Sequence, residues 1–316
     1  MNEKKIKFIK QVLILLLTIV IFIFLFSKID FFELINTFKQ VNLILLLFAI
    51  FISFFNNIFL NADMWKRILK YLGCNIPLKE AVFIRMASYP FKVLLPIKSG
   101  EFFRILYLKK QKNFSLKKGF VSIIFDIILN VCALLSFIFA SFVFLKINLF
   151  NIPFIIITGL IFSFITFFCL KSTQNFIFSI VKKIHLKFYN TLNILFAFEG
   201  IKSRKQSYFI LYAFTIQLIV LANYYILSRA LNLDIPFSKM ILIFPLIIII
   251  SLIPITISGL GIRESLIILF FSEFTSFQSL LGFGILISFV EYILPALVGL
   301  FFVKPFLTRM LYLKKL

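Results

Sequence analysis

Two short strings with the same residue order interrupt apolar stretches of this chain. Each has Leu-x-Pro-Ile, then Ser-Gly, and then an arginine after three further residues. Their polar and glycine positions are Ser99, Gly100 and Arg104 in the first string, and Ser258, Gly259 and Arg263 in the second. Because glycine tolerates a positive φ, each Ser-Gly pair predicts a tight turn. A helix that starts after such a turn exposes N–H groups and a positive dipole end, which favour anions.

Each arginine is expected near the start of that helix, where a guanidinium can make a two-pronged contact with a phosphate. Arg104 and Arg263 are therefore candidates for holding a phosphate-bearing headgroup. Glu101 and Glu264 lie beside them and could pair with them when the site is empty. The alternative is that each arginine forms a salt bridge that only fixes the local structure.

Two carboxylates fall inside apolar stretches, where a charge is costly. Asp126 lies within the apolar run 119–145, with Asn130 one helical turn later, and Glu291 lies near the middle of 278–303. An ionised carboxylate at such a depth must face a partner or water. Both are candidates for proton coupling or gating, and the alternative for both is a structural pair. A metal centre is not expected, because the chain has one His and three Cys with no CxxC pair, and no cofactor is predicted.

The composition defines the kind of protein that must position these groups. Hydrophobic residues make up 62% of the 316, 47 of them Phe, and the mean hydropathy is +1.08. Soluble domains have only about 45–50% apolar residues, so we expect an all-α polytopic membrane protein. The net charge of +22 is explained by basic cytoplasmic loops rather than by nucleic-acid binding.

A helix needs roughly 20 apolar residues to cross a bilayer, and six full spans are predicted on that basis. Their approximate ranges are 12–26, 41–60, 119–145, 152–170, 208–227 and 278–303. The stretches 81–97 and 240–257 contain prolines and are followed by the short apolar runs 102–108 and 265–271. We expect each to form a re-entrant hairpin with its short run, since irregular backbone at membrane depth must be covered by protein or line a cavity.

With both termini in the cytoplasm, most of the 34 Lys and Arg residues fall on the inner side. The expected outer loops carry only Lys28, Lys39, Lys146, Arg229 and Lys239. The positive-inside rule therefore supports this topology in the cell membrane. An amphipathic cytoplasmic linker is expected at about 172–206, because basic residues and apolar residues there alternate at helical spacing.

The two strings lie in two halves of one membrane domain, residues 1–316. Repeat 1 is expected at about 41–145 and repeat 2 at about 207–303, and the span before each hairpin runs in opposite directions in the two halves. This is an inverted repeat, in which two hairpins meet near the midplane, as in many transporters. The alternative is that Pro and Gly merely kink two helices for packing.

The two strings, read with their flanks, resemble the motifs of the lysylphosphatidylglycerol synthase transmembrane, or flippase-like, family. The family's first motif, Leu-Pro-x-x-x-Gly-Glu-x-x-Arg, is matched at Pro96, Gly100, Glu101 and Arg104. Its second, Pro-x-x-x-Gly-Gly-x-Gly-x-Arg-Glu, is matched at Pro254, Gly259, Gly261, Arg263 and Glu264. The chain departs at Ser258, where glycine is usual, and at Lys98-Ser99. The resemblance covers about residues 8–305.

This resemblance implies lipid handling, with the two motifs, Gly261 included, as the substrate-binding site. Residues 304–316 are too few for the aminoacyl transferase domain that accompanies this unit in the synthase, so no enzymatic activity is expected. We expect a translocator of a phospholipid or lipid-linked glycan, with membrane lipids, anionic ones in particular, as partners. Since the chain has no ATP-binding Gly-x-x-x-x-Gly-Lys-[Ser/Thr] loop, movement would be passive, ion-coupled or driven by a partner.

Two alternatives remain open from the sequence. One is an ion-coupled transporter of a small soluble anion, which a cleft closed to lipid would favour. The other is a membrane enzyme, or an accessory subunit of a lipid-glycan biosynthetic enzyme that would then be a partner. A substrate cleft that opens sideways to the bilayer would favour the lipid translocator.

Overall fold

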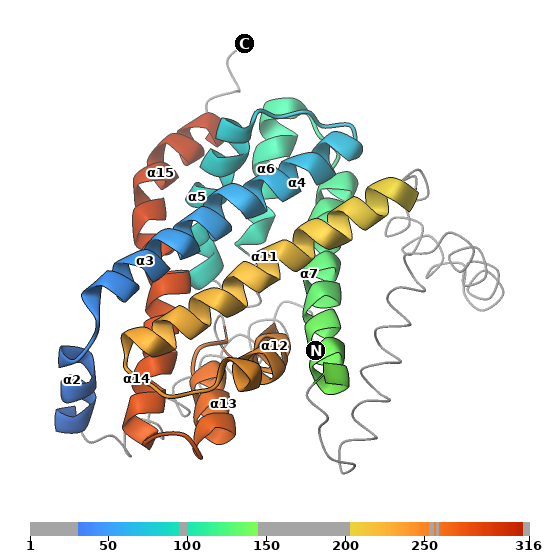
Figure 1. The fold of residues 1–316 in the computed structure, drawn as a ribbon. Coiled ribbons are helices and arrows are strands. Elements are labelled where there is room, and N and C mark those ends of the chain that lie inside the picture. Colours follow the sequence, from blue (N-terminus) through green and yellow to red (C-terminus); the bar gives the residue numbers. More distant parts are fainter. Residues whose placement is uncertain (1–30, 95–99, 145–202, 253–255, 257–258, 312–316) are drawn as a thin grey trace, which may run out of the picture.

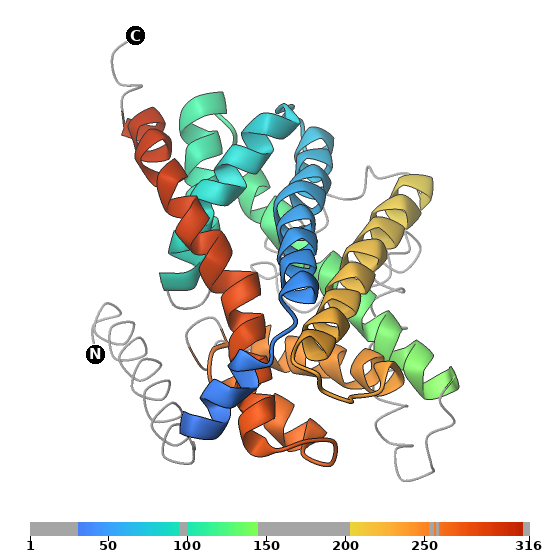
Figure 2. The same cartoon turned by 60° about the vertical axis from the view of Figure 1, so that its left-hand side comes forward.

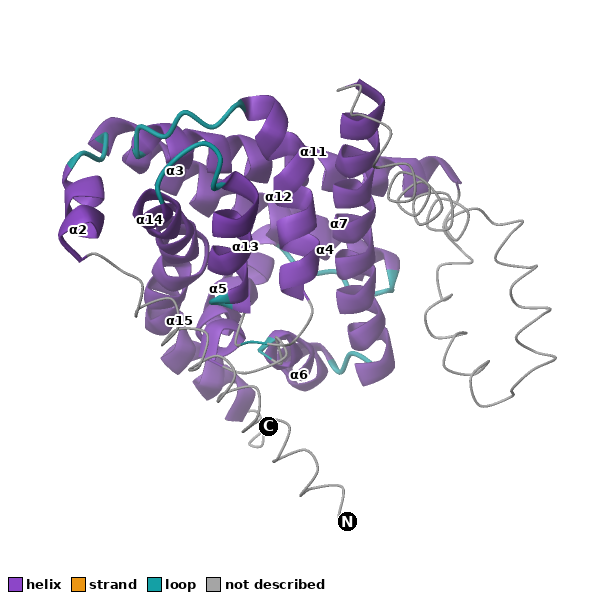
Figure 3. Cartoon of the chain, turned by 90° about the horizontal axis from the view of Figure 1, so that it is seen from below, coloured by secondary structure: helices purple, strands orange, loops and turns teal. Residues whose placement is uncertain are grey.

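The computed structural model describes residues 31–94, 100–144, 203–252, 256 and 259–311, and every regular element in these ranges is a helix (Figures 1 and 3). In chain order they are α2 (Phe31–Lys39), α3 (Leu43–Phe54), η1 (Phe55–Leu60), α4 (Asn61–Tyr71), α5 (Leu78–Leu94), α6 (Glu101–Lys112), α7 (Leu116–Phe144), α11 (Ser203–Ala230), α12 (Phe237–Leu252), α13 (Ile262–Phe271), α14 (Phe277–Ser288), η5 (Phe289–Ile293) and α15 (Leu294–Leu311). The two η elements are π-helical.

Four stretches of helix are long and apolar enough to cross a membrane: Leu43–Tyr71, Leu116–Phe139, Tyr208–Ala230 and Phe277–Met310. They correspond to the spans predicted at 41–60, 119–145, 208–227 and 278–303. The spans predicted at 12–26 and 152–170 lie outside the described residues. So do residues 172–202 of the expected linker, and α11 begins at Ser203.

Each expected hairpin contains two helices where two apolar runs were predicted. The first pair is α5 and α6, and the second is α12 and α13. Two of the prolines do not end their helices, because α5 continues through Pro90 and α12 through Pro245. Pro96 and Pro254 lie outside the described residues. Proline lacks an N–H and leaves the carbonyl four residues earlier without its helical donor. Each of the two helices therefore lacks one main-chain hydrogen bond at its proline.

The two halves exchange packing partners across the molecule. Helix α5 of the first half packs along α15 of the second, and α12 of the second half packs along α7 of the first. Helix α3, with the π-helical η1 and α4 continuing it, lies beside α11 (Figures 1 and 2). Each short hairpin helix packs against the long helix that follows it in the chain, α6 on α7 and α13 on α14.

Two apolar cores stabilise this arrangement. The first surrounds the buried Trp65 and joins α4, α5, α6 and α7 to parts of α11 and α15. The second surrounds Phe244 and joins α11, α12, α13 and α14. On α3, in contrast, large apolar side chains such as Leu43, Leu47 and Phe51 are exposed. Soluble proteins rarely expose several large apolar side chains next to one another, so this face of α3 is suited to contact with lipid.

Candidate functional site

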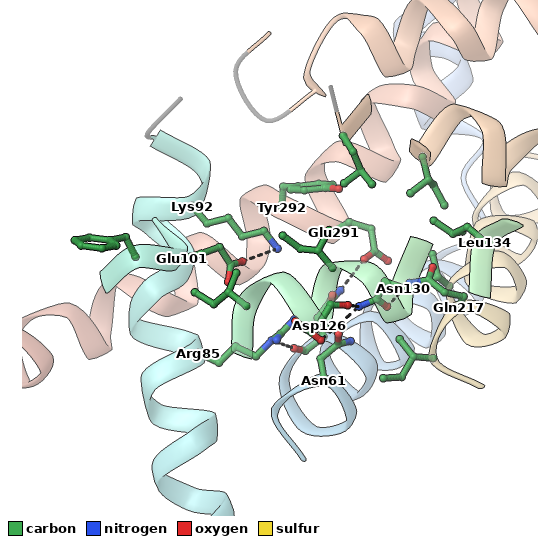
Figure 4. A pocket seen from close by; sticks show the side chains of 18 of the residues that line it. Asn61, Arg85, Lys92, Glu101, Asp126, Asn130, Leu134, Gln217, Glu291 and Tyr292 are labelled. Atoms are coloured by element: carbon green, nitrogen blue, oxygen red, sulfur yellow. Dashed lines mark hydrogen bonds and ion pairs between the residues drawn. The ribbon is translucent and has the colours of Figure 1, made fainter. Parts of the chain in front are cut away.

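A cavity of about 380 Å³ lies where the two halves meet (Figure 4). This volume is within the range of small-molecule sites, roughly 300–1,000 Å³. Its walls come from η1, α4, α5, α6, α7, α11, α12 and η5. The polar groups that line it are Asn57, Asn61, Arg85, Lys92, Glu101, Asp126, Asn130, Gln217, Tyr224, Glu291 and Tyr292. Such a density of polar groups inside an apolar helical protein marks the strongest candidate site among the described residues.

A line of polar contacts crosses the cavity wall from α5 to η5. The Arg85 Nε donates to the main-chain oxygen of Asn57 at 2.6 Å. The Asn57 side-chain amide in turn donates to Glu291 Oε2 at 2.6 Å, and the Asn223 amide donates to Glu291 Oε1 at 3.0 Å. The buried Glu291 carboxylate therefore has an amide donor on each oxygen, which lowers the free-energy cost of burying it.

The two π-helical segments place this pair of residues. Asn57 lies in η1 and Glu291 in η5, and the Ser53 hydroxyl also donates to the main-chain oxygen of Val290 at 3.3 Å. A π-helix contains an extra residue in its turn and occurs frequently at functional sites. Here the two π-helical segments direct the Asn57 and Glu291 side chains toward each other.

A second polar group lies on α7 and α11. The Asn130 amide donates to the main-chain oxygen of Asp126 at 2.7 Å, and the Gln217 amide donates to Asn130 Oδ1 at 2.6 Å. The half-buried Asp126 carboxylate lines the cavity together with Arg85. Asp126 and Glu291, predicted for proton coupling or gating, thus both line one cavity.

The structure places Arg104 behind the cavity wall. It is 1% exposed and, unlike Glu101, is not among the lining residues. Its guanidinium forms an ion pair with Glu101, donates from Nε to Ser88 Oγ at 3.1 Å and lies over the Trp65 ring. Ser88 Oγ donates to the main-chain oxygen of Arg85 at 2.8 Å. Arg104 is thus linked through Ser88 to the turn of α5 that carries Arg85.

Arg263 has an equivalent setting in the second half. It is buried, donates from Nη1 to Ser288 Oγ at 3.1 Å and lies over the Tyr292 ring at 4.4 Å. Ser288 Oγ donates to Glu264, whose other carboxylate oxygen accepts from the main-chain N–H of Gly261 at 2.6 Å. Ser288 directly precedes η5, so Arg263 and Glu264 brace the segment that carries Glu291.

The glycines of the two strings act differently from one another. Gly259 has φ of 76°, as predicted for the turn at its Ser-Gly pair. Gly261 also has a positive φ, 83°, which the sequence analysis did not predict. Gly100 has φ of −56°, so the positive φ expected there is wrong. It lies so close to α5 that a Cβ would overlap the main-chain nitrogen of Lys92. Ser99 and Ser258 lie outside the described residues.

Arg85 and Asn57 are site residues that the sequence analysis did not identify. Each is a polar residue inside an apolar stretch, at 81–97 and 41–60. That same signal singled out Asp126 and Glu291 and could have found them.

The rim of the cavity differs from its interior. Phe120 and Ile127 of α7 both line the cavity, yet they are 45% and 47% exposed. They share this part of α7 with Asp126. A polar interior is therefore continuous with an exposed apolar surface.

Several membrane-spanning helices around an internal polar cavity define a polytopic helical membrane protein. The family model for the lysylphosphatidylglycerol synthase TM region matches residues 11–299. The chain belongs to this family, and a membrane lipid-related function follows from that membership. No curated protein matches the chain.

Proposed function

We propose that this protein is a lipid translocator that binds the headgroup of a membrane lipid, an anionic one in particular, in the cavity between its two halves. The headgroup would lie among Arg85, Lys92 and the amide side chains, while the acyl chains stay in the bilayer. Membership of a family of lipid-related membrane regions supports this proposal. Transport without catalysis is part of the proposal.

The observation that carries it is the contrast between the interior and the rim of the cavity. Charged and amide groups line the inside, and the half-exposed Phe120 and Ile127 line the edge. A lipid has the matching division between a polar headgroup and apolar chains. A soluble anion would gain nothing from an apolar edge, because it has no apolar surface to bury.

The proposed movement uses an inverted repeat with two re-entrant hairpins. The exchange of packing partners, α5 with α15 and α12 with α7, supports a pseudo-two-fold relation between the halves. Rocking one half against the other would open the cavity to each leaflet in turn. The distribution of Lys and Arg supports a location in the cell membrane with both termini in the cytoplasm.

The test is translocation of fluorescent anionic phospholipid in proteoliposomes. Val220 lines the cavity from α11, so Val220→Trp should fill part of it and slow translocation. Leu211→Trp on the same helix is the matched control, because Leu211 is exposed on the outside. We expect wild type and the control to exceed empty liposomes and Val220→Trp to approach them. Wild type no faster than empty liposomes would refute the proposal.

Coupled transport of a small anion is the second candidate. The observation in its favour is Glu291, a buried carboxylate on the cavity wall that could exchange a proton during transport. Uptake of radiolabelled phosphate into the same proteoliposomes separates the two functions. Uptake of phosphate without lipid movement would support this candidate and reject the first.

A further inference from the structure

Arg85 is a buried charge with an unused donor. The residue is 4% exposed, and its Nε is taken by the Asn57 carbonyl. Its Nη1, however, is buried and has no hydrogen-bond acceptor among the described residues. An unsatisfied donor on a buried cation is costly, and it calls for an acceptor from a water, an ion or a ligand. The Nη1 of Arg104 is also buried without an acceptor among the described residues, but Arg104 does not line the cavity and Arg85 does.

The side chain lies on the cavity wall, directed toward the space that Asp126 and Asn61 share (Figure 4). Asp126 does not satisfy it, because Nη1 has no hydrogen-bond acceptor in the part of the chain that the structure describes. The second basic group of the cavity, Lys92, has a partner, since its Nζ lies 3.7 Å from Glu101 Oε1. Arg85 thus differs from the cavity's other cation in having an unfilled donor position.

The guanidinium is held in place from two sides. On one side, the hydrogen bond to Asn57 connects it to Glu291. On the other, Arg104 acts through Ser88 on the main chain of Arg85 itself. A planar guanidinium fixed in this way needs little further ordering when it binds an anion, and its fork matches phosphate oxygens.

We propose that Arg85 binds the phosphate of the lipid headgroup through its free Nη1, and that Arg104 and Glu291 are positioning residues for it. The inference rests on the proposed function, because the lipid is what brings the phosphate into the cavity. Asp126, the carboxylate that lines the cavity together with Arg85, would repel the phosphate and keep its binding reversible. The ligand class is a phosphate ester with acyl chains.

The experiment measures affinity for dihexanoylphosphatidylglycerol by calorimetry with the full chain in detergent. Three further probes are glycerophosphoglycerol, which lacks chains, inorganic phosphate, and dihexanoylglycerol, which lacks the phosphate. The variants are Arg85→Gln and Arg67→Gln. Arg67 is a matched control, since it pairs with Asp63 at 2.6 Å and does not line the cavity.

We expect Arg85→Gln to bind the phospholipid about 10- to 100-fold more weakly, the effect of losing one charge-assisted hydrogen bond. Its affinity for dihexanoylglycerol should not change, and Arg67→Gln should match wild type for both probes. Equal phospholipid affinity in Arg85→Gln and wild type would overturn the inference and leave the proposed function standing. Absence of phospholipid binding by wild type would overturn both.

Two further arms complete the design. If glycerophosphoglycerol or inorganic phosphate bound wild type as tightly as the phospholipid, the inference that the bound phosphate belongs to a lipid would be overturned. If Arg85→Gln does not fold, Asp126→Asn tests the same geometry with a smaller change. Among the described residues, the Asp126 carboxylate accepts a long hydrogen bond, 3.4 Å from the Asn130 amide. Asp126→Asn should bind the phospholipid severalfold more tightly, because a repulsive charge is removed. Unchanged or weaker binding would overturn the inference.

Discussion

Gly299 offers a sharp test of the packing that places α5 beside the cavity. It lies on α15 where that helix contacts α5, and a Cβ at this position would be 2.6 Å from the main-chain oxygen of Met86 and 2.8 Å from Pro90 Cδ. The Met86 carbonyl is the one that Pro90 leaves without its helical donor. Neither a main-chain carbonyl nor a proline ring can rotate away from an added methyl group, so Gly299→Ala must separate the two helices.

The magnitude follows from two opposing effects. Alanine is favoured over glycine within a helix by about 1 kcal/mol. Overpacking typically costs about 1–3 kcal/mol, and two rigid contacts below 3.0 Å place this site in the upper half of that range. We expect a net loss of about 1–2 kcal/mol in the free energy of unfolding. At Gly282 the nearest atom is the flexible end of Leu34, 3.3 Å away, so Gly282→Ala should be neutral or slightly stabilising.

The assay is reversible unfolding in mixed micelles by titration with sodium dodecyl sulfate, followed by circular dichroism. Wild type, Gly299→Ala and Gly282→Ala are compared at one lipid composition. If Gly299→Ala were as stable as wild type, the close approach of α15 to α5 would be refuted. Equal destabilisation by both variants would refute the argument from rigid neighbours.

Three other predictions follow from the described contacts. Arg104→Gln removes a buried partner of an ion pair and should lower the free energy of unfolding by about 3 kcal/mol in the same titration. A single cysteine at the exposed position Lys110 should react with an impermeant maleimide only from the cytoplasmic side. A single cysteine at the exposed position Asp234 should react only from the outer side. Labelling of both from one side would refute the topology. Burial raises the pKa of the Cys74 thiol, against an opposing effect of Lys112. With the other two cysteines replaced by serine, its labelling should be slow at pH 7 and rise about tenfold per pH unit as the thiolate forms; a rate independent of pH would contradict this.

The fold class was predictable because it depends on composition and on the length of apolar runs, which are local properties. The same holds for the turn at Gly259, where the positive φ favours glycine. It holds also for Asp126 and Glu291, since a carboxylate in an apolar run must face a cavity or a partner, and both line the cavity.

The direction in which each arginine points was not predictable. Arg85, Arg104 and Arg263 all look alike in the sequence, as cations in or beside apolar stretches. Arg104 and Arg263 donate to Ser88 and Ser288, which helix packing brings to them from other helices. The role of Gly100 was misjudged for a similar reason, because its contact with Lys92 arises only when α6 folds back on α5.

The π-helical segments η1 and η5 have a consequence for how this protein can change over evolutionary time. Each contains one residue more than an α-helix would use for the same turn, so it behaves as a one-residue insertion in a long helix. Deleting a single residue from η1 would restore regular α-helical winding and change the directions of the side chains in this segment. Such a deletion would separate Asn57 from Glu291 without altering either side chain. The length of these two helices, and not only their composition, is therefore expected to be under selection.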